Sequence, residues 1–338
     1  MSNPLNPTAQ PGMRLLRSAS VALAWLLWSA ACVTSPPVVV RDGYLTVPGG
    51  DRVYYRLIGE GADTLVFIAG GPALSSRYLE DGFGELATRH GLLFYDRRGI
   101  GRSPPANHPD SLTLAQEAGD LEALRRHFGL GRLNLVAHHW GAGVGHEYAR
   151  LNPGAVKREV LLAPMPIQAD VLFPLAKLPN DSAALARHGA ARAGLLDSLD
   201  PAGYCRQFWS FQFSPIEETD PQVIRRLGPA ICDATPARLR AREGLARILT
   251  RSLGAWSFAD SSMSATPRLI IVGARESLIS RAAGWWARPG EGRLLILGRT
   301  PLFPWLEAES RVAGAAEAFL SDGRWPDGAR VPPSPETP

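Results

Sequence analysis

Short apolar runs, each followed by a turn signal, recur along this chain from about residue 44. The expected strands, in chain order, are residues 44–47, 52–58, 64–69, 91–95, 133–137, 158–163, 268–272 and 293–297. The first two flank Pro48-Gly49-Gly50-Asp51, a turn that predicts a hairpin. The later runs are apolar at nearly every position, which is typical of strands buried on both faces of a parallel sheet.

Apolar residues at helical spacing fall between these strands. Residues 114–128, 140–151 and 307–320 are the clearest helices. Strands alternating with helices predict an α/β fold with a mostly parallel sheet and flanking helices. We expect its core to comprise residues 44–165 and 263–325.

The alternation stops over residues 166–262, where helical patterns continue without a convincing strand. An insertion of this length between two sheet strands predicts a helical cap over the carboxyl edge of the sheet. Ligands bind at that edge in open α/β sheets. The expected partner is therefore a small-molecule or peptide ligand under the cap.

The first 31 residues have the pattern of an export signal rather than of a folded domain. Arg14 and Arg17 precede an apolar run over 18–28, and small residues occupy 29–31. The run is too short to span a bilayer comfortably. Residues 32–43 are expected to be a tether, and residues 326–338 a loose tail.

The chain has three cysteines: Cys32, Cys205 and Cys232. In an exported protein, an odd number suggests that one thiol is used for something other than a disulfide within the chain. Cys205 and Cys232 can close a loop worth roughly 3 kcal/mol on the chain-entropy model. Cys32 is then left for a lipid. Two interpretations share a cut after Ala31: ordinary signal cleavage, or lipidation of Cys32. Both predict a bacterial envelope protein, either periplasmic or a membrane-anchored lipoprotein.

Composition narrows the choice of partners. The net charge is +4, but the basic residues are scattered along the chain, and Lys157 and Lys177 are the only lysines. Nucleic-acid binding normally requires a basic stripe, so we expect no nucleic-acid partner. His139 and His146, seven positions apart, are spaced poorly for binding one metal ion without a third protein ligand. We expect neither a metal nor a cofactor.

The segment LNLVAHHWGAGVG, residues 133–145, is a strand, a tight turn of small residues and a helix start. The same arrangement carries a nucleophilic serine in the pattern G-x-S-x-G. Here the five turn positions are Ala137-His138-His139-Trp140-Gly141. We call residues 137–141 the elbow.

Several further segments occur in a fixed order with the elbow. They are Ala69-Gly70-Gly71-Pro72, Tyr95-Asp96-Arg97-Arg98-Gly99-Ile100-Gly101-Arg102-Ser103, Gly273-Ala274-Arg275-Glu276 and Phe303-Pro304-Trp305-Leu306-Glu307. Together they resemble the α/β-hydrolase family, in its proline iminopeptidase and tripeptidyl aminopeptidase branch. The first three correspond to the family patterns H-G-G-P, Y-D-Q-R-G-x-G-x-S and G-x-x-D, and the elbow corresponds to G-H-S-W-G. Residues 303–307 match the segment just after the family's catalytic histidine. The resemblance covers about residues 44–325 and implies an α/β-hydrolase fold with a cap.

The catalytic positions depart from the family pattern. His139 stands at the nucleophile, Glu276 at the acid, and Leu302 where the histidine base belongs, while Ala69 replaces the histidine of the oxyanion loop. The last 150 residues contain no histidine, so a shifted alignment does not restore the base. Glutamate can serve as the triad acid, but the serine and the base are both missing. His138 matches a family position and is expected to be structural.

These departures favour a catalytically degenerate protein that binds its ligand under the cap. The predicted oxyanion donors, the backbone N–H groups of Gly71 and Trp140, need no particular side chain. The alternative is a hydrolase or lyase with altered chemistry that uses His139 and Glu276. A third hypothesis recruits Ser75 or Ser76, which follow the Gly-Gly-Pro loop.

Other polar residues have simpler expected roles. Asp96, Arg98 and Ser103 are expected to hold their loop by hydrogen bonds. In the cap, Glu217 and Glu218 either grip a substrate amino terminus or form a solvated acidic turn. The solvated turn is the simpler interpretation of these two residues.

Overall fold

The computed structural model of this chain describes residues 38–61, 63–71, 74–108, 112–165, 265–274, 283–287, 292–298 and 302–332. The chain divides into two units, Met1–Pro37 and Val38–Pro338, and all described residues belong to the second. The predicted export signal, the cap over 166–262, Glu276 and the three cysteines lie outside the described residues.

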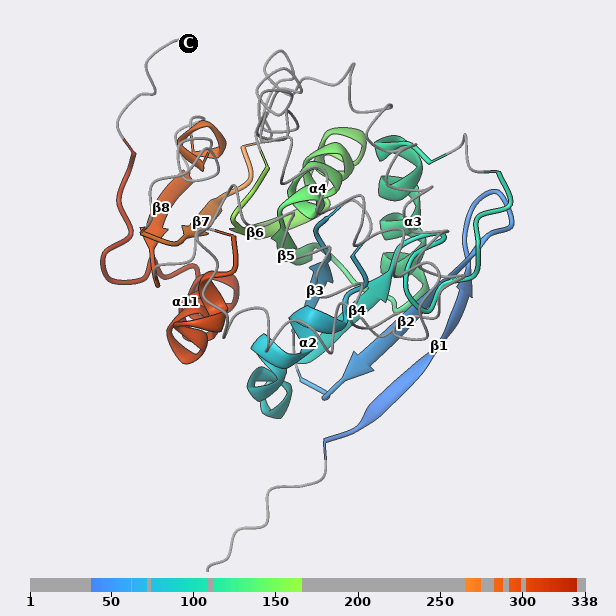
Figure 1. Cartoon of the computed structure of the whole chain (residues 1–338), viewed down its shortest axis with the longest axis horizontal. Coiled ribbons are helices and arrows are strands. Elements are labelled where there is room, and N and C mark those ends of the chain that lie inside the picture. Colours follow the sequence, from blue (N-terminus) through green and yellow to red (C-terminus); the bar gives the residue numbers. More distant parts are fainter. Residues whose placement is uncertain are drawn as a thin grey trace, which may run out of the picture. The chain divides into compact units, whose positions relative to one another are not determined.

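An eight-stranded sheet forms the centre of the described part (Figure 1). Its strands are β1 (Val40–Thr46), β2 (Arg52–Ile58), β3 (Thr64–Ile68), β4 (Gly91–Asp96), β5 (Leu133–His138), β6 (Val156–Leu162), β7 (Arg268–Val272) and β8 (Gly292–Ile296). Their spatial order is β1-β2-β4-β3-β5-β6-β7-β8. Strand β2 pairs antiparallel with β1 and β4, and every other neighbouring pair is parallel.

Helices cover the two faces of this sheet. They are α2 (Arg77–Phe83), α3 (Leu114–His127), α4 (Trp140–Leu151) and α11 (Glu309–Asp322), with short 3-10 turns η1 (Gly84–Thr88) and η3 (Pro304–Leu306). Side chains of α3 and α4 belong to one buried cluster, and those of α2 and α11 to the other. The helices therefore form two layers with the sheet between them (Figure 1).

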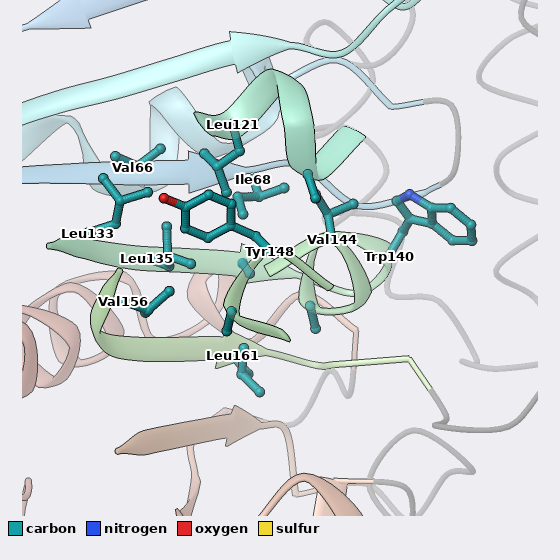
Figure 2. Close-up of a cluster of buried hydrophobic side chains, with 14 of the residues drawn as sticks. Val66, Ile68, Leu121, Leu133, Leu135, Trp140, Val144, Tyr148, Val156 and Leu161 are labelled. Carbon is teal, nitrogen blue, oxygen red and sulfur yellow. The ribbon is translucent and has the colours of Figure 1, made fainter. Parts of the chain in front are cut away.

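Alternation along the strands explains why both layers are needed. Leu65 and Phe67 of β3 belong to the cluster under α2 and α11, whereas Val66 and Ile68 belong to the cluster under α3 and α4. Figure 2 shows the second cluster, with the Tyr148 ring among the strand residues. Each fully buried side chain of this kind contributes roughly 1.5–3 kcal/mol, so neither face can be left to solvent.

The hydrophobic pattern predicted this architecture well. The predicted α/β fold with a mostly parallel sheet and flanking helices is confirmed, and the bounds 52–58, 268–272 and 140–151 agree with β2, β7 and α4. Within the described residues, no helix is long and apolar enough to cross a membrane.

Two boundaries and one helix differ from the prediction. Strand β1 begins at Val40, inside the predicted tether, because residues 40–42 pair with β2 although they are exposed. Arg330, in the predicted loose tail, exchanges backbone hydrogen bonds of 2.8 and 2.9 Å with Leu294. Helix α2 is short, and its apolar spacing alone did not predict it.

Candidate functional site

The elbow has the strained backbone that a strand-to-helix turn imposes on its central residue. His139 follows β5 directly and precedes α4, with φ 46° and ψ −107°. Its N–H donates to the Leu162 carbonyl at 3.0 Å, and its own carbonyl accepts from Ala142 at 3.1 Å. A Cβ on Gly141 would collide with the Ile68 carbonyl oxygen, so glycine is required there. Such strain costs on the order of 1–3 kcal/mol and persists only where the surroundings enforce it.

The His139 ring is uncharged at neutral pH. Burial lowers its pKa to about 4, and a backbone hydrogen bond with Gly71 opposes that fall. Because this bond favours the protonated ring, its partner is the Gly71 carbonyl, which accepts a ring N–H. His139 as a whole residue is partly exposed. The elbow therefore presents a neutral imidazole bound to the loop that the sequence assigned to oxyanion binding.

His138 forms a buried link between two loops. Its Nε2 lies 2.9 Å from the Leu302 carbonyl oxygen, which can only accept, so Nε2 carries the proton. Its Nδ1 then accepts from the Tyr78 hydroxyl at 2.6 Å, and the hydroxyl oxygen accepts from the Gly70 N–H at 2.7 Å. Burial, together with the nearby His139, holds the pKa of His138 well below its usual range. We call this series of hydrogen bonds, Gly70–Tyr78–His138–Leu302, the relay.

Position 302 thus lies close to the elbow, but its side chain is not a base. The Leu302 side chain is buried and belongs to the apolar cluster under α11, together with Phe303 and Trp305. The rings of Phe303 and Trp305 lie 5.4 and 5.0 Å from the His138 ring. The surroundings of this loop are therefore apolar where a hydrolase needs a histidine.

A buried ion pair ties the Gly70–Gly71 loop to the elbow helix. Arg97, which follows β4, donates to Glu117 of α3 at 3.2 Å and to the Gly70 carbonyl at 2.9 Å. Glu117 also accepts from the Trp140 indole N–H at 2.8 Å. All three side chains are almost completely buried.

The loop between β4 and α3 is held as the sequence predicted. The Asp96 carboxylate accepts from the Ser76 and Arg102 N–H groups at 2.7 and 2.9 Å, and the Ser103 hydroxyl donates to the Asp96 carbonyl at 2.5 Å. Arg98 donates to both Asp120 and Asp51. These contacts confirm a loop-holding role for Asp96, Arg98 and Ser103.

Ser76 is not available as a replacement nucleophile. It is fully buried, and its hydroxyl donates to Asp96 at 2.8 Å and accepts from Arg102 at 3.1 Å. Ser75 is buried as well. A nucleophilic hydroxyl needs a neighbouring base and access to substrate. The arrangement around Ser76 therefore argues against recruitment of this serine.

Sequence reasoning did not single out Glu117, Tyr78, Arg97 or Asp120. One signal was present: Glu117 and Asp120 fall on the face of 114–128 that also carries Leu121. An acid on a buried helix face requires a cation, and the chain offers two arginines at 97 and 98. Tyr78 had no comparable signal. Among the described residues, no group of three His, Cys, Asp or Glu side chains is placed to hold a metal ion.

Residues 63–280, more than half of the chain, match the family model described as the alpha/beta hydrolase fold, and the chain belongs to that family. Within it, the chain is a proline iminopeptidase-like member. A proline iminopeptidase of Lactobacillus helveticus is 38% identical over 97 residues, which are 27% of this chain and 33% of the relative. A probable proline iminopeptidase of Streptomyces coelicolor is 36% identical over 186 residues, 47% of this chain and 56% of the relative.

The matched regions of these two curated relatives therefore span between about a third and about half of their length. Solved structures agree on the fold over a larger share. A proline iminopeptidase-related protein from Thermus thermophilus has a TM-score of 0.63 at 22% identity, covering 85% of this chain and all of that one. An esterase from Thermogutta terrifontis has a TM-score of 0.59 at 19% identity, covering 83% and 98%.

Proposed function

We propose that this protein is an exported, proline iminopeptidase-like member of its family that has lost hydrolysis and acts by binding a ligand at the elbow. One observation carries the proposal: an imidazole stands at the nucleophile position, and the loop of the missing base presents buried Leu302. A serine and its base together perform acyl transfer, so the loss of both removes the catalytic cycle.

The protonation state of His139 supports binding over base catalysis. A general base works best when its pKa lies near the operating pH. The pKa of about 4 leaves His139 a weak proton acceptor at pH 7. Preserved backbone donors alone give roughly 10³–10⁴-fold acceleration over water in hydrolases. We therefore expect at most a trace activity.

Hydrolysis assays test the lost chemistry. Purified full-length protein is assayed with L-proline 4-nitroanilide and 4-nitrophenyl acetate beside His139→Ala. We expect the same trace rate from both proteins. Turnover near the median enzyme rate of about 10 s⁻¹, abolished by His139→Ala, would refute the proposal.

Binding is tested separately with an uncleaved probe. Thermal unfolding is followed by calorimetry in the presence of L-prolinamide, and in the presence of acetamide as a matched probe that lacks the pyrrolidine ring. A ligand held only by the native state stabilises it by about 2.7 kcal/mol at a hundredfold excess over Kd. We expect L-prolinamide, but not acetamide, to raise the melting temperature.

A restoration experiment separates lost chemistry from a changed pocket. His139→Ser with Leu302→His returns the family residues to the elbow and to the base position. Hydrolysis of L-proline 4-nitroanilide by the double variant would indicate an intact peptidase pocket. An inactive but folded double variant would indicate a pocket adapted to another ligand.

A second candidate function treats His139 as the nucleophile. The neutral ring favours it, because the ring nitrogen without a proton attacks the ester carbonyl and expels 4-nitrophenolate. Water then hydrolyses the resulting acyl-imidazolium to acetate, which releases two protons to solvent and returns the neutral ring. Glu276 would orient the ring in this scheme by accepting its single N–H in place of the Gly71 carbonyl. Mass spectrometry after an acid quench decides: an acetyl group on His139 supports this function, and an unmodified peptide rejects it.

Export and anchoring are part of the proposal and rest on the pattern over residues 1–31 with Cys32 next. Cell fractionation of the wild type and Cys32→Ser tests the anchor, because a lipid-anchored protein should move from the membrane to the soluble fraction. Non-reducing peptide mapping tests the proposed disulfide between Cys205 and Cys232.

A further inference from the structure

We call the elbow and the Gly70–Gly71 loop together the elbow site. The Glu117 carboxylate is connected to both parts, directly to Trp140 and through Arg97 to Gly70. It lies in the first turn of α3 on the buried face and is 2% exposed. Its Oε2 accepts from the Trp140 indole at 2.8 Å and lies 3.3 Å from an Arg97 Nη1 that also donates to Oε1. Arg97 and Trp140 come from two different segments next to the site.

Through Arg97, Glu117 determines the direction of one predicted donor. Arg97 Nη2 donates to the Gly70 carbonyl at 2.9 Å. That carbonyl and the Gly71 N–H belong to the same planar peptide unit, in which the two groups of a trans bond point in opposite directions. The grip on Gly70 therefore fixes where the Gly71 N–H points.

Through Trp140, Glu117 holds the other side. Trp140 is the first residue of α4 and follows the strained His139. Its backbone N–H is the second predicted donor, so the indole bond to Glu117 anchors the helix start at that donor. Figure 2 shows Trp140 extending from this end of the helix.

Arg97 also stands where the family segment carries glutamine, so this site contains a buried cation that the pattern lacks. A buried charge is tolerated when it is paired and hydrogen bonded. Glu117 supplies that charge, and the same carboxylate extends the pairing to the elbow helix. The ion pair is thus placed to hold two segments, beyond neutralising Arg97.

We propose that Glu117 is a positioning residue that holds the Gly71 and Trp140 backbone donors in register, so that the elbow site receives a carbonyl oxygen of its ligand. The inference rests on the proposed binding function and names the ligand group: a carbonyl of an amide or ester. It requires no chemistry at His139.

The chain offers a matched control for this role. Glu159 of β6 and Arg268 of β7 form another Glu–Arg pair at 2.6 Å, with both side chains 1% exposed. Removing one partner of either pair is strongly destabilising, because the other charge is left buried. Of the two glutamates, Glu117 is the one whose arginine binds the Gly70–Gly71 loop, so Glu159→Gln controls for lost stability alone.

The experiment compares hydrogen exchange in the full chain for Glu117→Gln and Glu159→Gln. We expect the Gly71 and Trp140 amides to exchange at least about tenfold faster in Glu117→Gln, with little change at either amide in Glu159→Gln, because local opening responds to local contacts. Equal exchange at these amides in the two variants would overturn the proposal.

Two further measurements keep the test decisive. If Glu117→Gln does not fold, Trp140→Phe leaves the ion pair and removes only the indole bond, so faster exchange is expected at residue 140 while Gly71, held through Arg97, is unchanged. L-prolinamide affinity should fall at least about tenfold in Glu117→Gln, relative to Glu159→Gln. If wild type binds no L-prolinamide, the proposed binding of this probe fails, while the exchange result alone decides the role of Glu117.

Discussion

The Tyr78 hydroxyl donates a 2.6 Å hydrogen bond to Nδ1 of His138, although 60 positions separate the two residues. This bond joins the Gly70 loop to the residue beside the elbow centre. It exists because α2 places Tyr78 against the end of β5, where both side chains are buried.

Tyr78→Phe should show how much the relay contributes to the free energy of unfolding. The variant leaves Nδ1 of His138 and the Gly70 N–H without their partner, and each buried unsatisfied group costs about 1–3 kcal/mol. We expect a loss of that order or more in urea unfolding. Tyr148→Phe is the control, since Glu122 keeps its partner Arg125 when the hydroxyl is lost. Equal losses would contradict the relay.

The backbone of the elbow predicts a reversal of the usual order of alanine and glycine. His139→Gly and His139→Ala both remove the imidazole, but only glycine relieves φ 46°, ψ −107°. We expect glycine to be more stable than alanine by about 1–2 kcal/mol. At Arg126 in helix α3, alanine should instead be better by about 1 kcal/mol. Thermal unfolding of the four variants measures both differences.

The lowered pKa of His139 predicts a loss of stability in acid. Burial lowers the pKa from 6.5 to about 4, so below pH 6.5 the unfolded chain binds this proton and the native state does not. The stabilisation is fully present above pH 6.5 and is lost as the pH falls toward 4. The wild type should lose about 2 kcal/mol more than His139→Ala between pH 7 and 5.

Urea unfolding at several pH values measures this difference. His127→Ala, on the exposed end of α3, controls for the loss of an imidazole as such. If the free energy of unfolding falls equally with pH in the wild type and in His139→Ala, the elbow imidazole does not titrate as predicted.

Arg98 should be among the costliest charged residues to replace. It is 2% exposed and donates to Asp51 at 2.7 Å and to Asp120 at 2.6 Å. Arg98→Met leaves two buried carboxylates, so we expect a loss of about 3–5 kcal/mol. Arg126→Met, which removes a 74% exposed arginine from its pair with Glu122, should cost no more than about 1 kcal/mol. Denaturant unfolding distinguishes the two losses.

The site was predictable where its signal was local. The elbow was recognised from five consecutive residues, and the central place of His139 among them assigns it to the nucleophile position. The buried partners of the site were not predictable in this way. Glu117 looked like an ordinary helix residue until the fold placed Arg97 and Trp140 against it, at separations of 20 and 23 positions.

The sequence by itself determined the strands, the main helices and the replacement of the serine by His139, because hydrophobic period and residue identity act over a few neighbouring positions. Only the tertiary structure decided the protonation state of His138 and the roles of Glu117 and Tyr78. The bond from His138 to the Leu302 carbonyl joins residues 164 positions apart. No local pattern encodes such a bond, because burial and partner are fixed only when the sheet and both helical layers close around it.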